Sequence, residues 1–153
     1  MKSMENFLTT IALLATVLNG IASIFGALQW WRVEQSRLAW RLIRAGQAAA
    51  ILLALGAGAA YFSGHEPDSS LFWIYALVPV GVGFFAEQFR ILSAQTVLDA
   101  RGLENAQAVG ALPEAEQRSI VVQIARRELG VMALAAGVIA FLTLRAVAEV
   151  PGL

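Results

Sequence analysis

The sequence predicts an all-α integral membrane protein built as a bundle of four transmembrane helices. Of its 153 residues, 58% are hydrophobic and only 14% are charged, whereas a soluble domain has about one quarter charged residues. The apolar residues form four stretches of the length that a helix needs to cross a hydrocarbon layer ~30 Å thick; they lie at about 7–31, 45–63, 71–91 and 129–148. Arginine is concentrated in only two of the gaps between them.

The spans are expected to be helices, and together they use all the strongly apolar sequence. Lipid offers the backbone no hydrogen-bond partners, so a span is either a helix or part of a closed barrel. Barrel strands alternate polar and apolar residues, and residues 48–55 (AAAILLAL) do not. We therefore predict one membrane bundle over residues 1–153, with no separate soluble domain.

The first span is expected at about 7–31. Lys2, the apolar run and the small residues Gly20 and Ala22 resemble a signal peptide. However, Glu5 offsets the charge of Lys2, and the run continues to Trp31, beyond the usual core of about 7–15 residues. We expect this segment to be retained, and we expect the second span at about 40–63.

The third helix is expected at about 70–100, longer than a bilayer is thick. Asp68 and Ser69 are both good N-caps for it, and Gly102 suits the position just after its end. At 1.5 Å per residue it would be ~48 Å long, so its last turns project into the cytoplasm. Pro79 predicts a kink within the membrane.

The fourth helix is expected at about 113–148 and also projects. Pro113 suits the first helical position, and Glu114 and Glu116 suit the positive helix end. Residues 103–112 would cap the projecting hairpin. An apolar seam is predicted between the two extensions, from Ile91, Leu92, Val97 and Leu98 to Ile120, Val121 and Ile124. The seam either staples the hairpin or docks a cytoplasmic protein partner.

The arginines predict the orientation, because cytoplasmic loops carry the excess of Arg and Lys. The connection at 64–70 has neither. The first and third connections contain Arg32, Arg37, Arg41, Arg44, Arg90, Arg101, Arg118, Arg126 and Arg127. Both termini are therefore expected outside. Ten arginines against one lysine indicate a GC-rich bacterial genome, so we expect a multi-pass protein of the bacterial cytoplasmic (inner) membrane.

The composition excludes several kinds of chemistry. Cysteine is absent, His65 is the only histidine and Lys2 the only lysine, which excludes thiolate catalysis, bis-His haem and a buried lysine Schiff base. No phosphate-binding loop, nucleophile elbow or HExxH motif occurs. We predict no catalytic residues, no metal and no cofactor. The formal net charge of zero argues against a nucleic-acid partner.

The chemically suggestive cluster is polar and lies at membrane depth. Glu87 falls inside the inner leaflet, where an ionisable residue needs a partner or water, and Arg90 is one turn away. Counted from the outer turn, Gln47 is level with Glu87 and Arg44 with Arg90. The hypothetical ion or anionic-headgroup site comprises Glu87, Gln88, Arg90, Arg44, Gln47 and Arg41. The structural alternative is an ion pair with arginines snorkelling to headgroups.

Small residues recur every fourth position in the second span, at Gly46, Ala50, Ala54 and Gly58. Such stripes let helix backbones approach closely in lipid. They predict either packing within the bundle or a homo-oligomer, and we expect the homo-oligomer. The other expected partner is the lipid bilayer itself.

Three functions compete at this level. The first is a non-enzymatic membrane subunit that self-associates or docks a partner. The second is a small transport protein, an ion or solute channel or carrier with its polar site around Glu87. The third and weakest is an enzyme that processes lipid headgroups, because one carboxylate and several arginines offer acid–base chemistry without a nucleophile or metal set.

Overall fold

The computed structural model describes residues 2–34, 36–65 and 69–150, and this part of the chain is entirely helical apart from its turns. Its five helices are α1 (Lys2–Arg32), α2 (Arg37–Phe62), α3 (Ser70–Ala100), α4 (Ala106–Gly110) and α5 (Glu114–Ala148). The four long helices coincide with the expected ranges to within a few residues. The short helix α4, inside the expected cap, was not predicted.

Local capping explains where the helices begin and end. The Ser36 and Ser69 hydroxyls each accept a hydrogen bond from the backbone N–H two residues later, at 3.2 Å, and so cap α2 and α3. Ser69 is one of the two predicted caps; the other, Asp68, lies outside the described residues. Gly102 follows α3 with a φ of +66°, as predicted. Pro113 precedes the first residue of α5 instead of occupying it.

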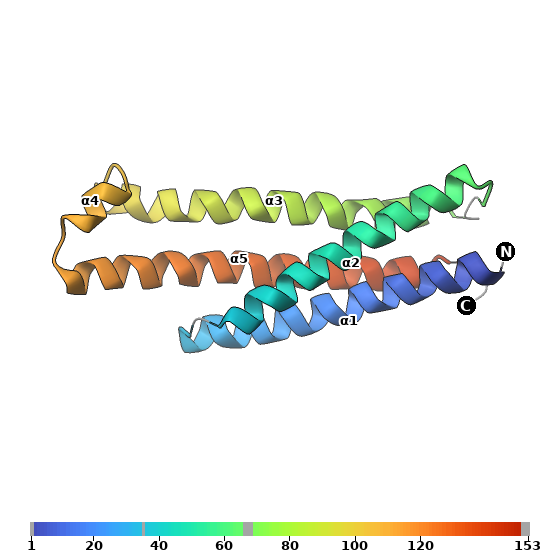
Figure 1. Cartoon of the computed structure of the whole chain (residues 1–153), viewed down its shortest axis with the longest axis horizontal. Coiled ribbons are helices and arrows are strands. Elements are labelled where there is room, and N and C mark those ends of the chain that lie inside the picture. The colour runs from blue at the N-terminus through green and yellow to red at the C-terminus, as the bar shows by residue number, and fades with distance from the viewer. Residues whose placement is uncertain (1, 35, 66–68, 151–153) are drawn as a thin grey trace.

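The helix α5 is the centre of the arrangement. It contacts α1 and α3 more extensively than any other pair of elements does, and α1 contacts α2. Figure 1 shows α2 crossing the other long helices diagonally. The α3–α5 hairpin and α4 extend beyond the turn between α1 and α2, as predicted, and both termini lie at the opposite end of the molecule (Figure 1). The helix α3 runs without a break through Pro79, so the predicted kink does not divide it.

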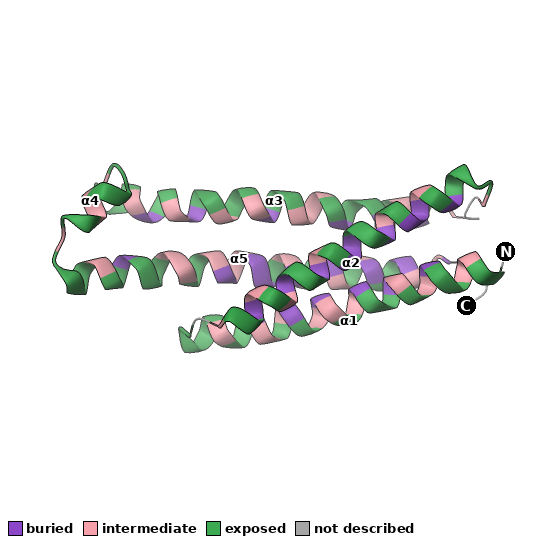
Figure 2. Cartoon of the chain, in the orientation of Figure 1, coloured by how far each residue is buried: buried purple, intermediate pink, exposed green. Residues whose placement is uncertain are grey.

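The interior is built largely from small side chains. Two buried clusters are present, one around Leu53 and Phe72 near the termini and one around Ile43 and Met132 nearer the arginines. Alanines supply much of both clusters. Figure 2 shows the buried residues gathered where the long helices run together, and mostly exposed or intermediate residues along the projecting hairpin. The small residues allow the helix backbones to approach closely.

The small-residue stripe of α2 is partly used inside the chain. A Cβ atom added at Gly46 would lie 2.6 Å from Asn19 Oδ1, and Ala50 is buried. Ala54 is only partly covered, and a Cβ atom at Gly58 would meet nothing within 4 Å. Half of the stripe predicted for self-association is therefore occupied by intramolecular packing.

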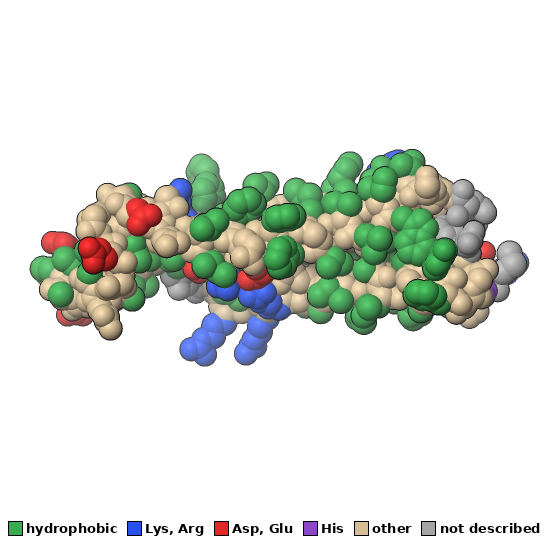
Figure 3. All heavy atoms as spheres, turned by 90° about the horizontal axis from the view of Figure 1, so that it is seen from above, with side chains coloured by type: hydrophobic (Ala, Val, Ile, Leu, Met, Phe, Trp, Pro, Cys, Tyr) green, Lys and Arg blue, Asp and Glu red, His purple; other side chains and the backbone are tan. Residues whose placement is uncertain are grey.

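The outer surface is apolar along most of the bundle. Large side chains such as Ile24, Leu55 and Leu134 are 67%, 64% and 72% exposed. Figure 3 shows hydrophobic side chains over most of one face, with blue side chains near its middle and acidic ones toward the end of the hairpin. Water is a poor solvent for so much contiguous apolar surface. All four long helices are long and apolar enough to span a membrane.

The predicted apolar seam is only partly correct. Val97 and Ile120 are buried at 1% exposure, but Ile91, Leu92 and Val121 are 58%, 51% and 55% exposed. The reason is helical phase. The buried positions of α3 in this region are Ala86, Ser93 and Val97, and successive residues are rotated by about 100° around a helix with 3.6 residues per turn. The exposed residues therefore lie on other faces.

Replacing Gly46 with Ala should destabilise the bundle, because the new methyl group would displace the buried Asn19 amide, whose Nδ2 donates to the Gly46 carbonyl at 2.9 Å. We expect a loss of about 1–3 kcal/mol, as for other overpacked interiors, measured by denaturant titration in mild detergent. Gly58→Ala is the matched control, since the added methyl group meets open space. Equal stability of both variants would contradict this packing.

Candidate functional site

Four of the six predicted site residues come together at the interface between α2 and α3. Arg44 and Gln47 are one turn apart on α2, and they face Glu87 and Arg90, one turn apart on α3. Two antiparallel helices joined by a short connection bring residues equally distant from the turn to the same level. The predicted pairing of Gln47 with Glu87 follows from this rule, and the structure confirms it with a hydrogen bond of 3.1 Å from Gln47 Nε2 to Glu87 Oε1.

The Glu87 carboxylate accepts hydrogen bonds from three side chains. Arg44 holds it with both terminal nitrogens, Nη1 on Oε1 and Nη2 on Oε2 at 3.3 Å. Arg90 donates from Nε to Oε2 at 3.0 Å, and Gln47 completes the set. Each oxygen therefore accepts two hydrogen bonds, and the charge is compensated by two guanidinium groups. This arrangement connects α2 to α3 and pairs the carboxylate with opposite charge.

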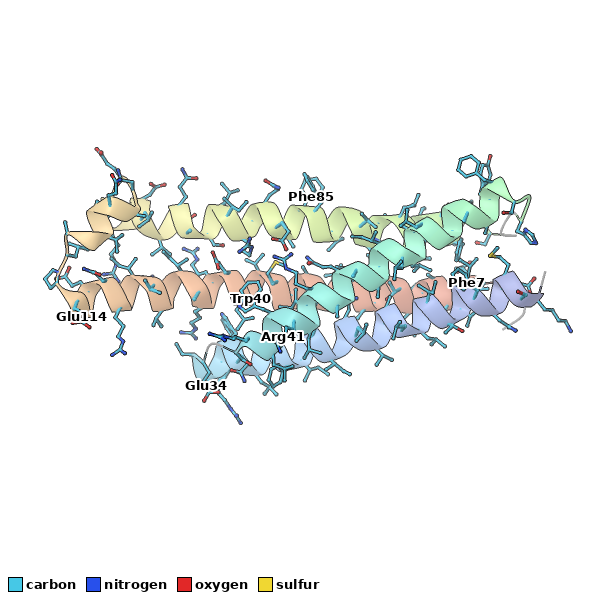
Figure 4. All side chains as sticks on the ribbon, viewed as in Figure 1. Phe7, Glu34, Trp40, Arg41, Phe85 and Glu114 are labelled. Carbon is cyan, nitrogen blue, oxygen red and sulfur yellow. The ribbon has the colours of Figure 1, made fainter. Side chains whose placement is uncertain are left out.

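Arg41 and Gln88 lie apart from this cluster, and their part in a binding site stays a prediction. Both are exposed, and neither forms an ion pair or side-chain hydrogen bond in the described part of the chain. Figure 4 shows Arg41 on the outer side of α2, and Trp40 on the side toward α3 and α5. Gln88 follows Glu87 by one residue, a rotation of about 100°, which turns it away from α2.

Sequence reasoning missed two neighbours of Arg90. The Arg90 guanidinium carbon lies 5.8 Å from the centroid of the Trp40 ring, a cation–π distance. Glu128 of α5 is partly buried and near enough to interact electrostatically with Arg90 and Glu87. The sequence places Glu128 at the start of the fourth apolar stretch, but it does not show which face of α5 turns toward α3. The charges of two arginines, Arg44 and Arg90, therefore balance those of two glutamates, Glu87 and Glu128, at this site.

Two arginine–tryptophan pairs mark one level across the bundle. Arg126 lies over Trp30 at 5.0 Å, in addition to Arg90 over Trp40. These four residues come from α5, α1, α3 and α2, so each long helix contributes one. Near the opposite end, Arg145 lies over Tyr75 at 5.5 Å and pairs with Glu149 at 3.5 Å. Arginine and tryptophan side chains have this distribution at the two interfaces of a bilayer.

An open groove adjoins the Glu87 cluster. It has a volume of about 320 Å³ and is lined mainly by apolar atoms, with Ile51, Pro79, Val80 and Phe84 beside the polar group. It lies where α2 and α3 are in less extensive contact than α5 is with its neighbours. The groove is large enough for a small molecule, but the only carboxylate in its lining is already held by three donors.

Replacing Glu87 with Gln should weaken the bundle, because Arg44 and Arg90 would lose their anionic partner. The Glu87 side chain is 24% exposed, so we expect a loss of about 1–2 kcal/mol, between the values for exposed and buried pairs. The measurement is the unfolding midpoint in mild detergent. Arg41→Gln and Gln88→Ala are matched controls outside the cluster and should leave the unfolding midpoint unchanged. A Glu87→Gln protein as stable as the original would remove the structural role.

Comparison with known proteins offers no relative from which a role could be transferred to these residues. No protein-family model, no curated protein and no solved structure matches the chain. A function for it has to be inferred from its own residues, charges and packing.

Proposed function

We propose that the chain is a four-span integral membrane protein that acts as a non-enzymatic subunit and docks a partner on its cytoplasmic side. The observation that carries the membrane part is the band of exposed apolar side chains around all four long helices. Lipid is the solvent that removes the cost of this surface. The arginine–tryptophan level at one end of the band and the Arg145–Tyr75 pair at the other support two membrane interfaces.

The proposed orientation has both termini outside and the α3–α5 hairpin in the cytoplasm. It is supported by the arginines, which are concentrated near the α1–α2 turn and the hairpin, and by the rule that such segments stay in the cytoplasm. The bacterial inner membrane is the proposed location; its support is the preference for arginine over lysine.

The docking role is supported by the hairpin. It reaches beyond the turn between α1 and α2 (Figure 1), and it leaves Val121 and Val122 of α5 55% and 39% exposed. Ile91 and Leu92 of α3 add apolar surface close to Arg90. The seam of the hairpin does not cover these side chains, so they leave apolar surface for a partner. Self-association through the α2 stripe has less support, because Gly46 and Ala50 are covered within the chain.

A channel or carrier with its site at Glu87 is the second proposal. The groove of about 320 Å³ beside Glu87 favours it. The hydrogen bonds of the Glu87 carboxylate argue against it, because an ion or proton would have to displace Arg44, Arg90 or Gln47. The Glu87→Gln variant separates the two roles: in liposomes, a transport site loses ion flux with the charge, whereas a structural cluster changes only stability.

Single cysteines at residues 66 and 108 should be labelled from opposite sides of the membrane. The natural chain has no cysteine, so each label reports one position. With an impermeant reagent on intact cells, we expect labelling at 66 and, only after permeabilisation, at 108. Labelling of both positions from the same side would contradict the topology, and extraction of the chain by carbonate would contradict the membrane location.

A photo-reactive residue at Val121 should capture a protein partner in cells. Val138 is the matched control on the same helix, because it is 41% exposed but lies inside the apolar band. We expect a discrete adduct at 121 and none at 138. An adduct of twice the chain's mass would indicate self-association instead, and the absence of any adduct at 121 and 91 would contradict the docking role.

A further inference from the structure

A second groove lies between α1, α3 and α5 and contains no α2 residue. Its volume is about 590 Å³, within the range of sites for small molecules. Trp30 and Ala27 of α1, Ser93 of α3, and Arg127, Val131 and Leu134 of α5 are among its lining residues. The Glu87 groove shares none of these residues. The two grooves are therefore distinct sites.

The groove runs along the membrane normal of the proposed orientation, and its lining changes from charged to apolar along its length. At one end Trp30 packs against Gly130, where an added Cβ would lie 2.9 Å from the indole nitrogen. Toward the other end Ser23 packs against Gly137, where an added Cβ would lie 2.8 Å from the Ser23 hydroxyl oxygen. These contacts are seven residues apart on each helix, or ~10 Å. Trp30 belongs to the arginine–tryptophan level, so Arg127 is at the headgroup end.

Among the described residues, none pairs with the charge at this end of the groove. Arg127 takes part in no salt bridge among residues 2–34, 36–65 and 69–150, and no Asp or Glu lines the groove. Its neighbour Arg126 is placed over Trp30, and both residues line a separate, smaller pocket. An exposed arginine at a headgroup level, above an apolar groove, complements an anionic group that carries an alkyl chain.

We propose that this groove binds one anionic phospholipid, with its phosphate on Arg127 and one acyl chain against Ala27, Val131 and Leu134. A free phosphate would use Arg127 but would leave the apolar walls uncovered. A protein helix would cover the walls, but it would have to bring an acid to the membrane interface. A phospholipid supplies both parts and is present at high concentration in the membrane. The inference rests on the membrane location proposed above.

Native mass spectrometry of the full chain in mild detergent tests the site, with phosphatidylglycerol and phosphatidylcholine titrated as probes. We expect one phosphatidylglycerol to be retained in preference to phosphatidylcholine. Arg127→Gln should lower its affinity about tenfold, the effect of one charge-assisted contact. Arg118→Gln is the matched control, because Arg118 is an exposed arginine of α5 that does not line the groove.

A second variant tests the apolar part. Val131→Trp should fill the groove and reduce retention while Arg127 is kept, and Ala27→Phe does the same from α1 if the first variant does not fold. Unfolding midpoints confirm that the compared variants are intact. Equal retention of the two lipids, or unchanged retention in Arg127→Gln, would overturn the site while leaving the membrane location standing. Extraction of the original chain by carbonate would instead overturn the membrane location itself.

Discussion

An apolar outer surface is the constraint from which the rest of this structure follows. Side chains such as Ile24, Leu55 and Leu134 point outward, so the proposed solvent is lipid. In lipid the hydrophobic effect no longer holds helices together, because the acyl chains are as apolar as leucine. Close packing has to replace it. The chain achieves this around α5, where Gly26 lies against Ala133 and Gly130 against Trp30, each so close that an added Cβ would be 2.9 Å from its neighbour.

Several polar interactions in the bundle connect two helices. Asn19 of α1 donates to the Gly46 carbonyl of α2 at 2.9 Å, and Thr16 of α1 donates to Thr143 of α5 at 3.0 Å. Glu87 connects α3 to α2 through Arg44 and Gln47. A single hydrogen bond of this kind contributes only about 0.6 kcal/mol in a membrane. Their value lies in fixing which faces meet, since small apolar faces alone allow several rotations.

The sequence was informative about position along the helices and poor about rotation around them. Apolar length and the Ser69 and Gly102 signals placed the ends of α3, and distance from the turn between α2 and α3 placed Gln47 level with Glu87. The directions in which Arg41, Gln88 and Val121 face could not be predicted, because a helix that is apolar on every side gives no signal for its inward face. Glu128 was missed for a related reason: the sequence predicts that the fourth helix packs against the third, but not which residues of α5 turn toward α3.

The diagonal course of α2 explains why one bundle has two grooves that differ in charge, one compensated and one positive. Where α2 reaches α3, it brings Arg44 and Gln47 to Glu87. The charges beside the resulting groove compensate each other, because the chain supplies both the arginine and the carboxylate. Where α1 and α3 flank α5 without α2, no acid among the described residues lines the groove or forms a salt bridge with Arg127. The first groove therefore holds the protein's own ion pair, and it gives an external anion little to compensate. The second leaves a positive charge above an apolar wall, the arrangement that an anionic lipid completes. The proposed lipid site therefore lies where α2 is absent, because α2 contributes its polar side chains only to the groove beside Glu87.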